Sequence, residues 1–275
     1  MRDAPFVIRG SGTGPVILSV PHAGRDYAPW VTRLRLPVSA ARPLEDRWAD
    51  RLAEAAIAAG TPALIAQVPR LVIDLNREES DLDPAMVAGP GSGHPVSARA
   101  RSGLGLIPSR LSGCGTLWRG PLSPLDVAAR LSGIYRPWHA ALATLLQTAR
   151  ARHGTAILID LHSMPPLDSG YDIVIGDRFG ASADDRIAAT AEAVLTGQGF
   201  RVTRNVPYAG GAIATRHGKP MFGVHALQIE IDRRLYLDAD FDQPGPGLAF
   251  VQNAVAAIVS ALRAECRPSY AVAAE

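Results

Sequence analysis

Two histidines stand at the ends of apolar runs that are typical of buried strands. His22 follows Val16–Val20 and precedes a glycine-containing turn, while His162 closes the run that begins at Ala156 and stops before Pro165. Open α/β sheets keep their ligands at the carboxyl ends of strands. Imidazole is a common zinc ligand, and strand ends are rigid enough to hold a tetrahedral set of ligands. The two histidines therefore predict a metal site; the alternative is a pair of core histidines with satisfied hydrogen bonds.

A proton carrier for such a site is offered by the run Leu227–Ile231. A period of two residues points Gln228 and Glu230 to one face of a strand and the isoleucines to the other. A carboxylate flanked in this way is partly desolvated, which raises its pKa toward neutrality. A group of that kind can take a proton from water and pass it to a leaving amine. Glu230 is thus the predicted general base and acid, with Asp232 as a competitor and a surface ion pair as the alternative.

An α/β sheet would bring these residues together. Apolar runs alternate with helical patterns along the chain, which indicates a largely parallel sheet covered on both faces. The predicted strands are Val16–Val20, Ala63–Val68, Leu71–Leu75, Ala156–Leu161, Asp172–Ile175 and Leu227–Ile231. The predicted helices are Leu44–Ala59, a pattern from Val127 to Leu145 that Pro137 should kink or divide, Asp184–Leu195 and Leu248–Ala264.

Length and composition narrow the class of protein. We expect one domain over residues 1–275, with a Gly-, Pro-, Ser- and Arg-rich loop at about 81–124. The net charge of +2 comes with dispersed arginines, so no nucleic-acid partner is expected. Cys114 and Cys266 form no C-x-x-C pair, which disfavours a disulfide framework or a cysteine zinc site. No leader and no run of about 18 apolar residues is apparent, so we expect a cytoplasmic protein without a membrane partner.

Short motifs along the chain resemble, in order, those of the N-formylglutamate amidohydrolase family. They are Val20-Pro21-His22-Ala23-Gly24, Glu45-Asp46-Arg47-Trp48, Val72–Arg77, Asp160–Ser163, Thr215–Gly218 and Gln228–Ile231. That family is related to zinc carboxypeptidases and aspartoacylases. The resemblance implies a phosphorylase/hydrolase-like three-layer α/β/α sandwich with one catalytic zinc ion. It also implies a small-molecule N-acyl amino acid as substrate, most directly N-formylglutamate, cleaved to glutamate and formate as in histidine degradation.

Residues and resemblance together suggest the metal ligands. His22 and His162 would supply nitrogens and Asp46 a carboxylate, which leaves a fourth tetrahedral position for water. The related peptidases carry the carboxylate three residues after the first histidine, where this chain has Arg25, a cation that cannot bind zinc. Asp46 therefore takes this role, although an acid at a helix start is also favoured by the helix dipole alone. The competing acids nearby are Glu45 and Asp50.

Arginines are the expected anchors of the substrate. Asn76 and Arg77 match the pair that grips the substrate carboxylate in carboxypeptidase-like families, and a guanidinium fork suits a carboxylate. Arg70 lies where aspartoacylase-like enzymes carry an arginine that stabilises the oxyanion. Arg216 is the candidate for a second substrate carboxylate. Asp160 is expected to support an imidazole rather than to bind the metal.

The other histidines show no paired ligand spacing. We expect His217 near the site because of its neighbours, and structural or surface roles for His94, His139, His153 and His225. Two other functions remain open: a carboxypeptidase or N-acyl amino-acid deacylase of another specificity, and a non-catalytic metal-binding protein of the same fold. The joint presence of the proposed ligands and Glu230 argues against the second.

Overall fold

The computed structural model describes residues 4–87 and 96–266, so His94 and part of the expected 81–124 loop lie outside the described residues. A sheet of seven strands forms the centre: β1 (Phe6–Arg9), β2 (Val16–Val20), β3 (Ala63–Ala66), β6 (Ala156–Met164), β7 (Ile173–Gly176), β8 (Val202–Arg204) and β9 (Val224–Asp232). Their order is β1-β3-β2-β6-β9-β7-β8. β1 with β3 and β7 with β9 are antiparallel, and the other neighbours are parallel. The predicted mixed, largely parallel sheet is confirmed.

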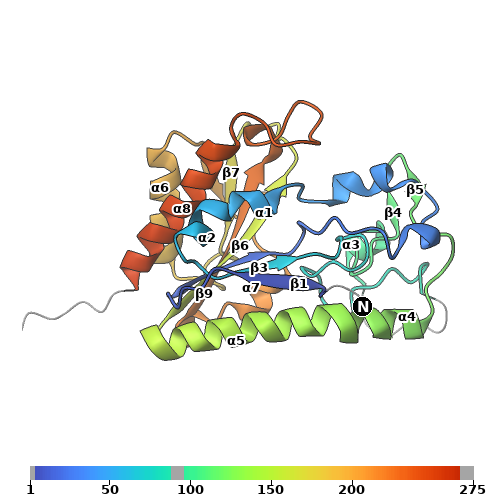
Figure 1. The fold of residues 1–275 in the computed structure, drawn as a ribbon, viewed down its shortest axis with the longest axis horizontal. Coiled ribbons are helices and arrows are strands. Elements are labelled where there is room, and N and C mark those ends of the chain that lie inside the picture. The colour runs from blue at the N-terminus through green and yellow to red at the C-terminus, as the bar shows by residue number, and fades with distance from the viewer. Residues whose placement is uncertain (1–3, 88–95, 267–275) are drawn as a thin grey trace, which may run out of the picture.

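Helices cover both faces of this sheet (Figure 1). One layer holds α1 (Ala49–Leu52), α2 (Glu54–Ala58), α6 (Asp185–Gly197) and α8 (Leu248–Glu265); the other holds α4 (Pro124–Arg130), α5 (Arg136–His153) and α7 (Ala212–His217). Alternation along β2 divides the core, because Val16 and Leu18 pack in the first layer and Ile17 packs in the second. The molecule is therefore the three-layer α/β/α sandwich that the resemblance implies.

The two longest strands, β6 and β9, lie next to each other at the centre. Every residue of β6 is buried, and β9 is buried from its second residue onward. Their parallel register pairs Asp160 with Gln228 and His162 with Glu230. β2 lies on the other side of β6 and ends at Val20, just before His22. The carboxyl ends of these central strands thus meet at one edge, as the sequence predicts.

The segment Leu71–Leu75 is buried but is not a strand, so that prediction was wrong. Its backbone bends: the Val72 amide donates to the Pro69 carbonyl at 2.9 Å, and the Asp74 amide donates to the Leu106 carbonyl at 2.7 Å. Loop and side-chain partners satisfy its polar groups where a neighbouring strand would otherwise do so. A short apolar run indicates a buried segment, but burial alone does not determine whether the backbone forms a strand.

The expected helix Leu44–Ala59 is also broken. A 3₁₀ turn (Val38–Leu44) is followed by an extended break and then by α1 and α2. Trp48 adopts a left-handed conformation with φ of 59° in this break, and its indole Nε1 donates to the Asp242 carbonyl at 2.8 Å. Asp46 therefore lies in a fixed irregular segment and not in a helix.

The long helical pattern after residue 124 is divided, as Pro137 suggests. α4 continues through a π-helical turn (Leu131–Tyr135) into α5, and Pro137 lies in the first turn of α5. There its missing N–H costs little, because the first helical amides have no partner within the helix. The remaining predicted helices are confirmed as α6 and α8 within one or two residues.

Short edge strands escaped the sequence prediction. β1 and β8 are at most half-buried and flank the sheet. The segment after residue 81 holds α3 (Ala98–Arg101) and a small hairpin of β4 (Arg110–Leu111) and β5 (Gly115–Thr116). Few apolar residues mark such elements, so their sequence signal is weak.

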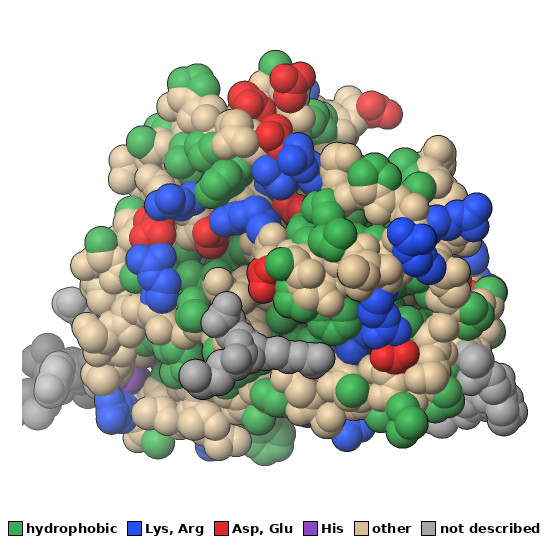
Figure 2. Space-filling model, turned by 45° about the vertical axis from the view of Figure 1, so that its right-hand side comes forward, with side chains coloured by type: hydrophobic (Ala, Val, Ile, Leu, Met, Phe, Trp, Pro, Cys, Tyr) green, Lys and Arg blue, Asp and Glu red, His purple; other side chains and the backbone are tan. Residues whose placement is uncertain are grey.

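The apolar helix α8 and the distribution of surface charge bear on whether a membrane or a nucleic acid is a partner. α8 is long and apolar enough to cross a membrane by length and composition alone, but Val251, Val255, Ile258 and Leu262 are buried in the core of the sandwich. Figure 2 shows positive and negative side chains interspersed on the face it displays, without a continuous basic stripe. Neither feature points to a membrane or nucleic-acid partner.

Candidate active site

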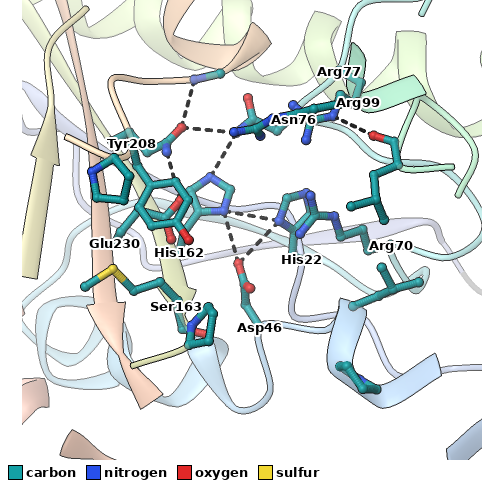
Figure 3. A pocket seen from close by; sticks show the side chains of 18 of the residues that line it. His22, Asp46, Arg70, Asn76, Arg77, Arg99, His162, Ser163, Tyr208 and Glu230 are labelled. Carbon is teal, nitrogen blue, oxygen red and sulfur yellow. Dashed lines mark hydrogen bonds and ion pairs between the residues drawn. The ribbon is translucent and has the colours of Figure 1, made fainter. Parts of the chain in front are cut away.

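A cavity of about 350 Å³ opens at the carboxyl ends of the central strands (Figure 3). Its walls combine strand ends with the irregular segments around residues 43–46, 70–77, 99–111 and 207–211. The polar side chains that line it are His22, Asp46, Arg70, Asn76, Arg77, Arg99, His162, Ser163, Tyr208, Gln228, Glu230 and Arg233. The structure thus brings together all but one of the predicted site residues.

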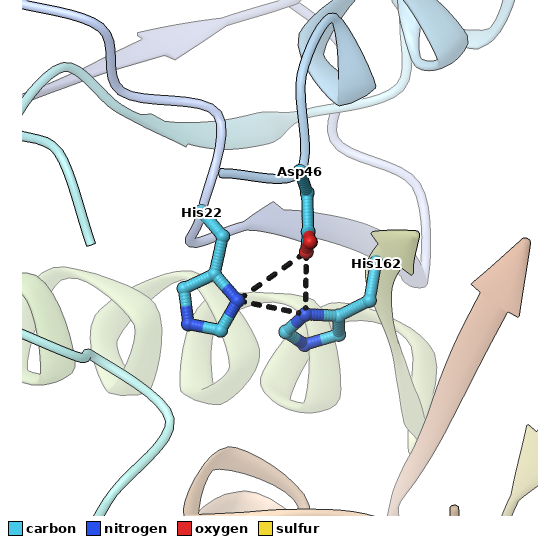
Figure 4. Close-up of side chains that lie close together, drawn as sticks. All are labelled: His22, Asp46 and His162. Carbon is cyan, nitrogen blue, oxygen red and sulfur yellow. Dashed lines mark hydrogen bonds and ion pairs between the residues drawn. The ribbon is translucent and has the colours of Figure 1, made fainter. Parts of the chain in front are cut away.

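Three side chains converge at the floor of this cavity (Figure 4). The Nδ1 atoms of His22 and His162 are 3.1 Å apart, and Asp46 Oδ2 lies 3.3 Å from the first and 3.0 Å from the second. All three residues are only 2% exposed. Ligand atoms at bond lengths of about 2.0–2.1 Å from a tetrahedral ion lie roughly 3.3 Å apart, so these separations fit a zinc-sized ion.

The outer nitrogens of both imidazoles are bound to carboxylates. His22 Nε2 lies 2.7 Å from Asp74 Oδ1, and His162 Nε2 lies 2.8 Å from Asp160 Oδ2. With the proton on Nε2, each imidazole donates to its carboxylate and turns the lone pair of Nδ1 toward Asp46. Three acceptor atoms then face one another with no hydrogen between them. Such a set of donors fits a metal cation.

The electrostatics of this cluster lead to the same conclusion. Burial alone would lower the pKa of His162, but Asp160 and Asp46 outweigh it and raise that pKa well above the usual value. Burial alone would raise the pKa of Asp46, yet its contacts with both histidines hold it well below the usual range. The cluster therefore keeps its carboxylate ionised and attracts positive charge, either a proton or a metal ion.

The rival acids have other partners. Glu45 accepts the Tyr27 hydroxyl at 2.6 Å and an Arg47 guanidinium hydrogen bond at 2.7 Å. Asp50 is held by two 2.9 Å hydrogen bonds from Arg25, the residue at the position where related peptidases carry a ligand. Asp46 is the acid that faces the two histidines.

Glu230 enters the cavity from β9, beside His162 on β6. It is 8% exposed, and burial raises the pKa of its carboxyl group. Gln228 Nε2 donates to Glu230 Oε1 at 2.9 Å, while Gln228 Oε1 accepts from Asn76 Nδ2 at 3.2 Å. This chain of side-chain amides fixes the direction of Glu230. The competitor Asp232 is bound by Arg234 and does not line the cavity.

The anchors expected for a substrate come from the irregular segment at residues 70–77. Asn76 Oδ1 accepts from the Ile213 amide at 2.8 Å, and a Cβ on Gly211 would lie 2.4 Å from this oxygen, so the Asn76 side chain packs directly on glycine. Arg77 Nε donates to the Leu104 carbonyl at 3.1 Å, and Arg70 Nε donates to Asp74 Oδ2 at 2.8 Å. Both residues line the cavity, and within the described residues their outer guanidinium nitrogens make no hydrogen bond.

Arg216 is the predicted site residue that the structure does not place in the cavity. It lies 3.6 Å from Glu79 and over the ring of Tyr135, at 5.4 Å from the ring centroid. α7 buries Ile213 and Ala214, and its turn carries Arg216 to the exposed side. The expectation of a second carboxylate anchor at Arg216 is therefore corrected.

Three lining residues were missed by the sequence reasoning: Arg99, Tyr208 and Arg233. Arg233 directly follows β9 and donates to the Glu45 carbonyl at 2.7 Å, so its place at a strand end was a usable signal. Arg99 comes from the short helix α3 and Tyr208 from a loop, and nothing in their local sequence sets them apart from other arginines and tyrosines.

Fold and site together define a three-layer α/β/α protein with a candidate metal site in a cavity at the strand ends, and comparisons with known proteins specify its family. A family model described as N-formylglutamate amidohydrolase matches residues 14–237. N-formylglutamate deformylase of Pseudomonas aeruginosa is 30% identical over 236 residues, which cover 82% of this chain and 84% of that protein. Its counterpart from Pseudomonas putida is 29% identical over 236 residues, covering 82% and 83%.

A solved structure gives the same result. The crystal structure of N-formylglutamate amidohydrolase from Ralstonia eutropha JMP134 is 31% identical in sequence and superposes with a TM-score of 0.86, covering 95% of this chain and 97% of that one. The chain belongs to the N-formylglutamate amidohydrolase family and is an amidohydrolase.

Proposed function

We propose that this enzyme removes the formyl group of N-formylglutamate, with water as co-substrate and glutamate and formate as products. The observation that carries the proposal is the convergence of His22, Asp46 and His162 beside Glu230 and Arg77 in one cavity. The names of the relatives support the substrate. We infer a single-domain cytoplasmic enzyme of histidine degradation, in which Arg99, Leu104 and Leu111 form part of the cavity wall.

His22, Asp46 and His162 would hold one zinc ion. When bound, zinc lowers the pKa of water and polarises a carbonyl oxygen. Asp74 and Asp160 orient the two imidazoles and make them more basic, which strengthens their hold on a cation. Asp46 adds the negative charge that a two-histidine site otherwise lacks.

Glu230 moves the proton. Its carboxylate takes a proton from the attacking water and gives it to the nitrogen of the scissile amide as the C–N bond breaks. A buried carboxyl with a raised pKa suits both halves of this cycle, because it accepts and returns the proton near neutral pH. Gln228 holds one of its oxygens and so aims the other.

Asn76 and Arg77 would bind the α-carboxylate and fix the distance between the amide and Glu230. Arg70 would face the oxygen of the scissile carbonyl, where negative charge develops. Burial lowers the pKa of Arg70, but Asp74 outweighs this effect and raises the pKa above its usual value, so the guanidinium stays charged. A charge fixed in place before the reaction stabilises the developing oxyanion.

A direct assay tests the proposal. Purified protein is analysed for zinc and incubated with N-formylglutamate, N-acetylglutamate and a glutamate-terminated peptide, and amine release is followed. We expect formylglutamate to be preferred by at least about tenfold, activity to disappear with a chelator and zinc to restore it. Preference for another acyl group would indicate a different deacylase or a carboxypeptidase. Bound zinc without release from any substrate would indicate a non-catalytic metal-binding protein.

A further inference from the structure

The cavity carries more positive charge than one substrate carboxylate requires. Two carboxylates line it, against four arginines: Arg70, Arg77, Arg99 and Arg233. Arg70 is paired with Asp74, and Arg233 lies 3.5 Å from Asp46 and is bound to Ser163 and to main-chain oxygens. Arg77 is the anchor proposed for the α-carboxylate. Within residues 4–87 and 96–266, the guanidinium of Arg99 has no hydrogen bond or ion pair.

Arg99 is held in a fixed relation to Arg77 through one residue. The amide of Leu104 donates to the Arg99 carbonyl at 2.8 Å, and the Leu104 carbonyl accepts from Arg77 Nε at 3.1 Å. Both arginines line the cavity, on the wall away from Glu230 (Figure 3). The fold thus fixes the backbone of Arg99 relative to the guanidinium of Arg77.

The short helix α3 that carries Arg99 is anchored at both ends. Ser97 caps it by accepting from the Ala100 amide at 3.0 Å, and the Ser97 hydroxyl donates to Asp81 at 2.9 Å. Gly105 lies so close that an added Cβ would be 2.4 Å from the Asp81 carbonyl oxygen. The backbone of Arg99 is therefore well positioned, although its side chain is exposed.

The two arginines act on each other electrostatically. Burial lowers the pKa of Arg77, and the nearby charges of Arg70 and Arg99 lower it further. The charge of Arg99 also acts on Tyr208, another lining residue. A ligand with two negative charges would relieve this repulsion, whereas a ligand with one would leave a cation unpaired.

We propose that Arg99 binds the side-chain carboxylate of the substrate and so selects dicarboxylic over monocarboxylic N-acyl amino acids. Arg99 takes the role expected of Arg216, which pairs with Glu79 outside the cavity. This inference rests on the proposed function for its reaction, but it concerns a binding preference that can be measured without turnover.

The test compares N-formylglutamate with N-formylglutamine, whose side chain has the same shape but no charge. The ratio of kcat/KM for the two substrates is measured for wild type, Arg99→Met and Arg99→Lys. We expect Arg99→Met to reduce the ratio by about tenfold, the lower end for a hydrogen bond to a charged group because Arg99 is exposed. Activity on formylglutamine should fall much less than activity on formylglutamate, and Arg99→Lys should restore part of the ratio.

Arg119→Met is the matched control, because Arg119 is an exposed arginine of the same segment that lies outside this cavity. An unchanged ratio in Arg99→Met, or an equal change in Arg119→Met, would overturn the assignment.

A second measurement does not depend on the reaction. In calorimetric titrations with L-glutamate and L-glutamine, Arg99→Met should show the same loss of preference for the dicarboxylate. If the wild type hydrolyses neither substrate, the proposed function fails and the titration alone decides the role of Arg99.

Discussion

Two pairs of buried histidines in this molecule look alike but differ in their surroundings. His22 and His162 face each other through nitrogens 3.1 Å apart, with ring centroids separated by 4.8 Å. His139 and His217 face each other through nitrogens 2.9 Å apart, with nearly parallel rings and centroids separated by 5.2 Å. Only the first pair is surrounded by carboxylates. Short distances between imidazoles therefore do not define a metal site.

A main-chain oxygen completes the hydrogen bonding of the second pair. His139 Nε2 donates to the Leu75 carbonyl at 3.1 Å, so its Nδ1 must accept the hydrogen of His217 Nε2. Burial lowers the pKa of His139 to about 3 and that of His217 to about 4, so both rings are neutral near pH 7. A hydrogen atom occupies the space between these two nitrogens, whereas the corresponding nitrogens of the first pair both face Asp46, in a cluster that attracts a proton or a metal ion.

The turn that carries Asn76 lies between the two pairs. On one side the side-chain amide of Asn76 donates to Gln228 Oε1 at 3.2 Å. On the other side, α5 and the π-helical turn before it hold the flanking carbonyls: His139 in α5 binds that of Leu75, and the hydroxyl of Tyr135 in the turn donates to that of Arg77 at 2.7 Å. One pair is suited to hold a cation and the other fixes the backbone beside it.

The largest effect should come from exchanging an imidazole for a methyl group in each pair. We expect His22→Ala and His162→Ala to lose bound metal and activity, with losses beyond the tenfold to hundredfold typical when only a residue supporting a ligand is removed. His217→Ala should retain zinc. Metal analysis and circular dichroism of the purified variants check this, and stoichiometric zinc in His162→Ala would remove the difference between the pairs.

The proposed proton carrier, Glu230, lies beside the first pair. Glu230→Gln keeps the hydrogen bonding and size of the side chain but cannot carry the proton, so turnover should fall by about 10²–10⁴-fold with zinc still bound. Asp232→Asn, on the same strand but paired with Arg234, is the control. Single-turnover kinetics measure the loss, and near-normal turnover in Glu230→Gln would reassign the base.

The turn between the pairs should show a smaller effect. Arg77→Lys keeps the charge but loses the forked hydrogen bonding, and kcat/KM should fall by an amount equivalent to about 1.5–3 kcal/mol. An α-amidated substrate, which offers no carboxylate, should respond little to the same change. Equal losses on both substrates would mean that Arg77 acts on the backbone through Leu104 and does not bind the carboxylate.

The smallest effect concerns acid stability and belongs to the second pair. The pKa values of His139 and His217 are lower in the folded protein than the usual 6.5, so the unfolded chain binds more protons below that pH. Their stabilising contribution is full above pH 6.5 and is lost as the pH falls toward about 4 and about 3. Each histidine contributes at most about 1.4 kcal/mol per pH unit.

We therefore expect the unfolding free energy of His217→Gln to depend less steeply on pH between 6 and 4 than that of the wild type. Urea unfolding of chelator-treated protein at several pH values measures the slope. His153→Gln, which changes an exposed histidine, should keep the wild-type slope. Identical slopes in His217→Gln and wild type would mean that the second pair is not held neutral.

The sequence predicted the parts of the site that follow regular strands. His22, His162 and Glu230 were found because apolar runs mark the central strands and the chemistry lies at their ends. Asp46 depended on the family resemblance, since the helical pattern over Leu44–Ala59 did not reveal the break in which Asp46 lies. Arg216 was misplaced because a six-residue helix gives too little periodicity to show which side is buried. Arg99 was missed because its relation to Arg77 is a tertiary contact through Leu104.

The pairing of His162 with Glu230 across β6 and β9 also limits how this gene can change in length. Asp160 and His162 share the strand face of Ala156 and Leu158, which pack toward α5, while their neighbours Ile157, Ile159 and Leu161 pack toward α8. A single-codon deletion early in β6 would turn the imidazole into the hydrocarbon layer under α8, and would bring Ser163 to the position of His162 and Leu161 to that of Asp160. Insertions and deletions should therefore be purged from β6 during evolution, even where many point substitutions of its apolar residues persist.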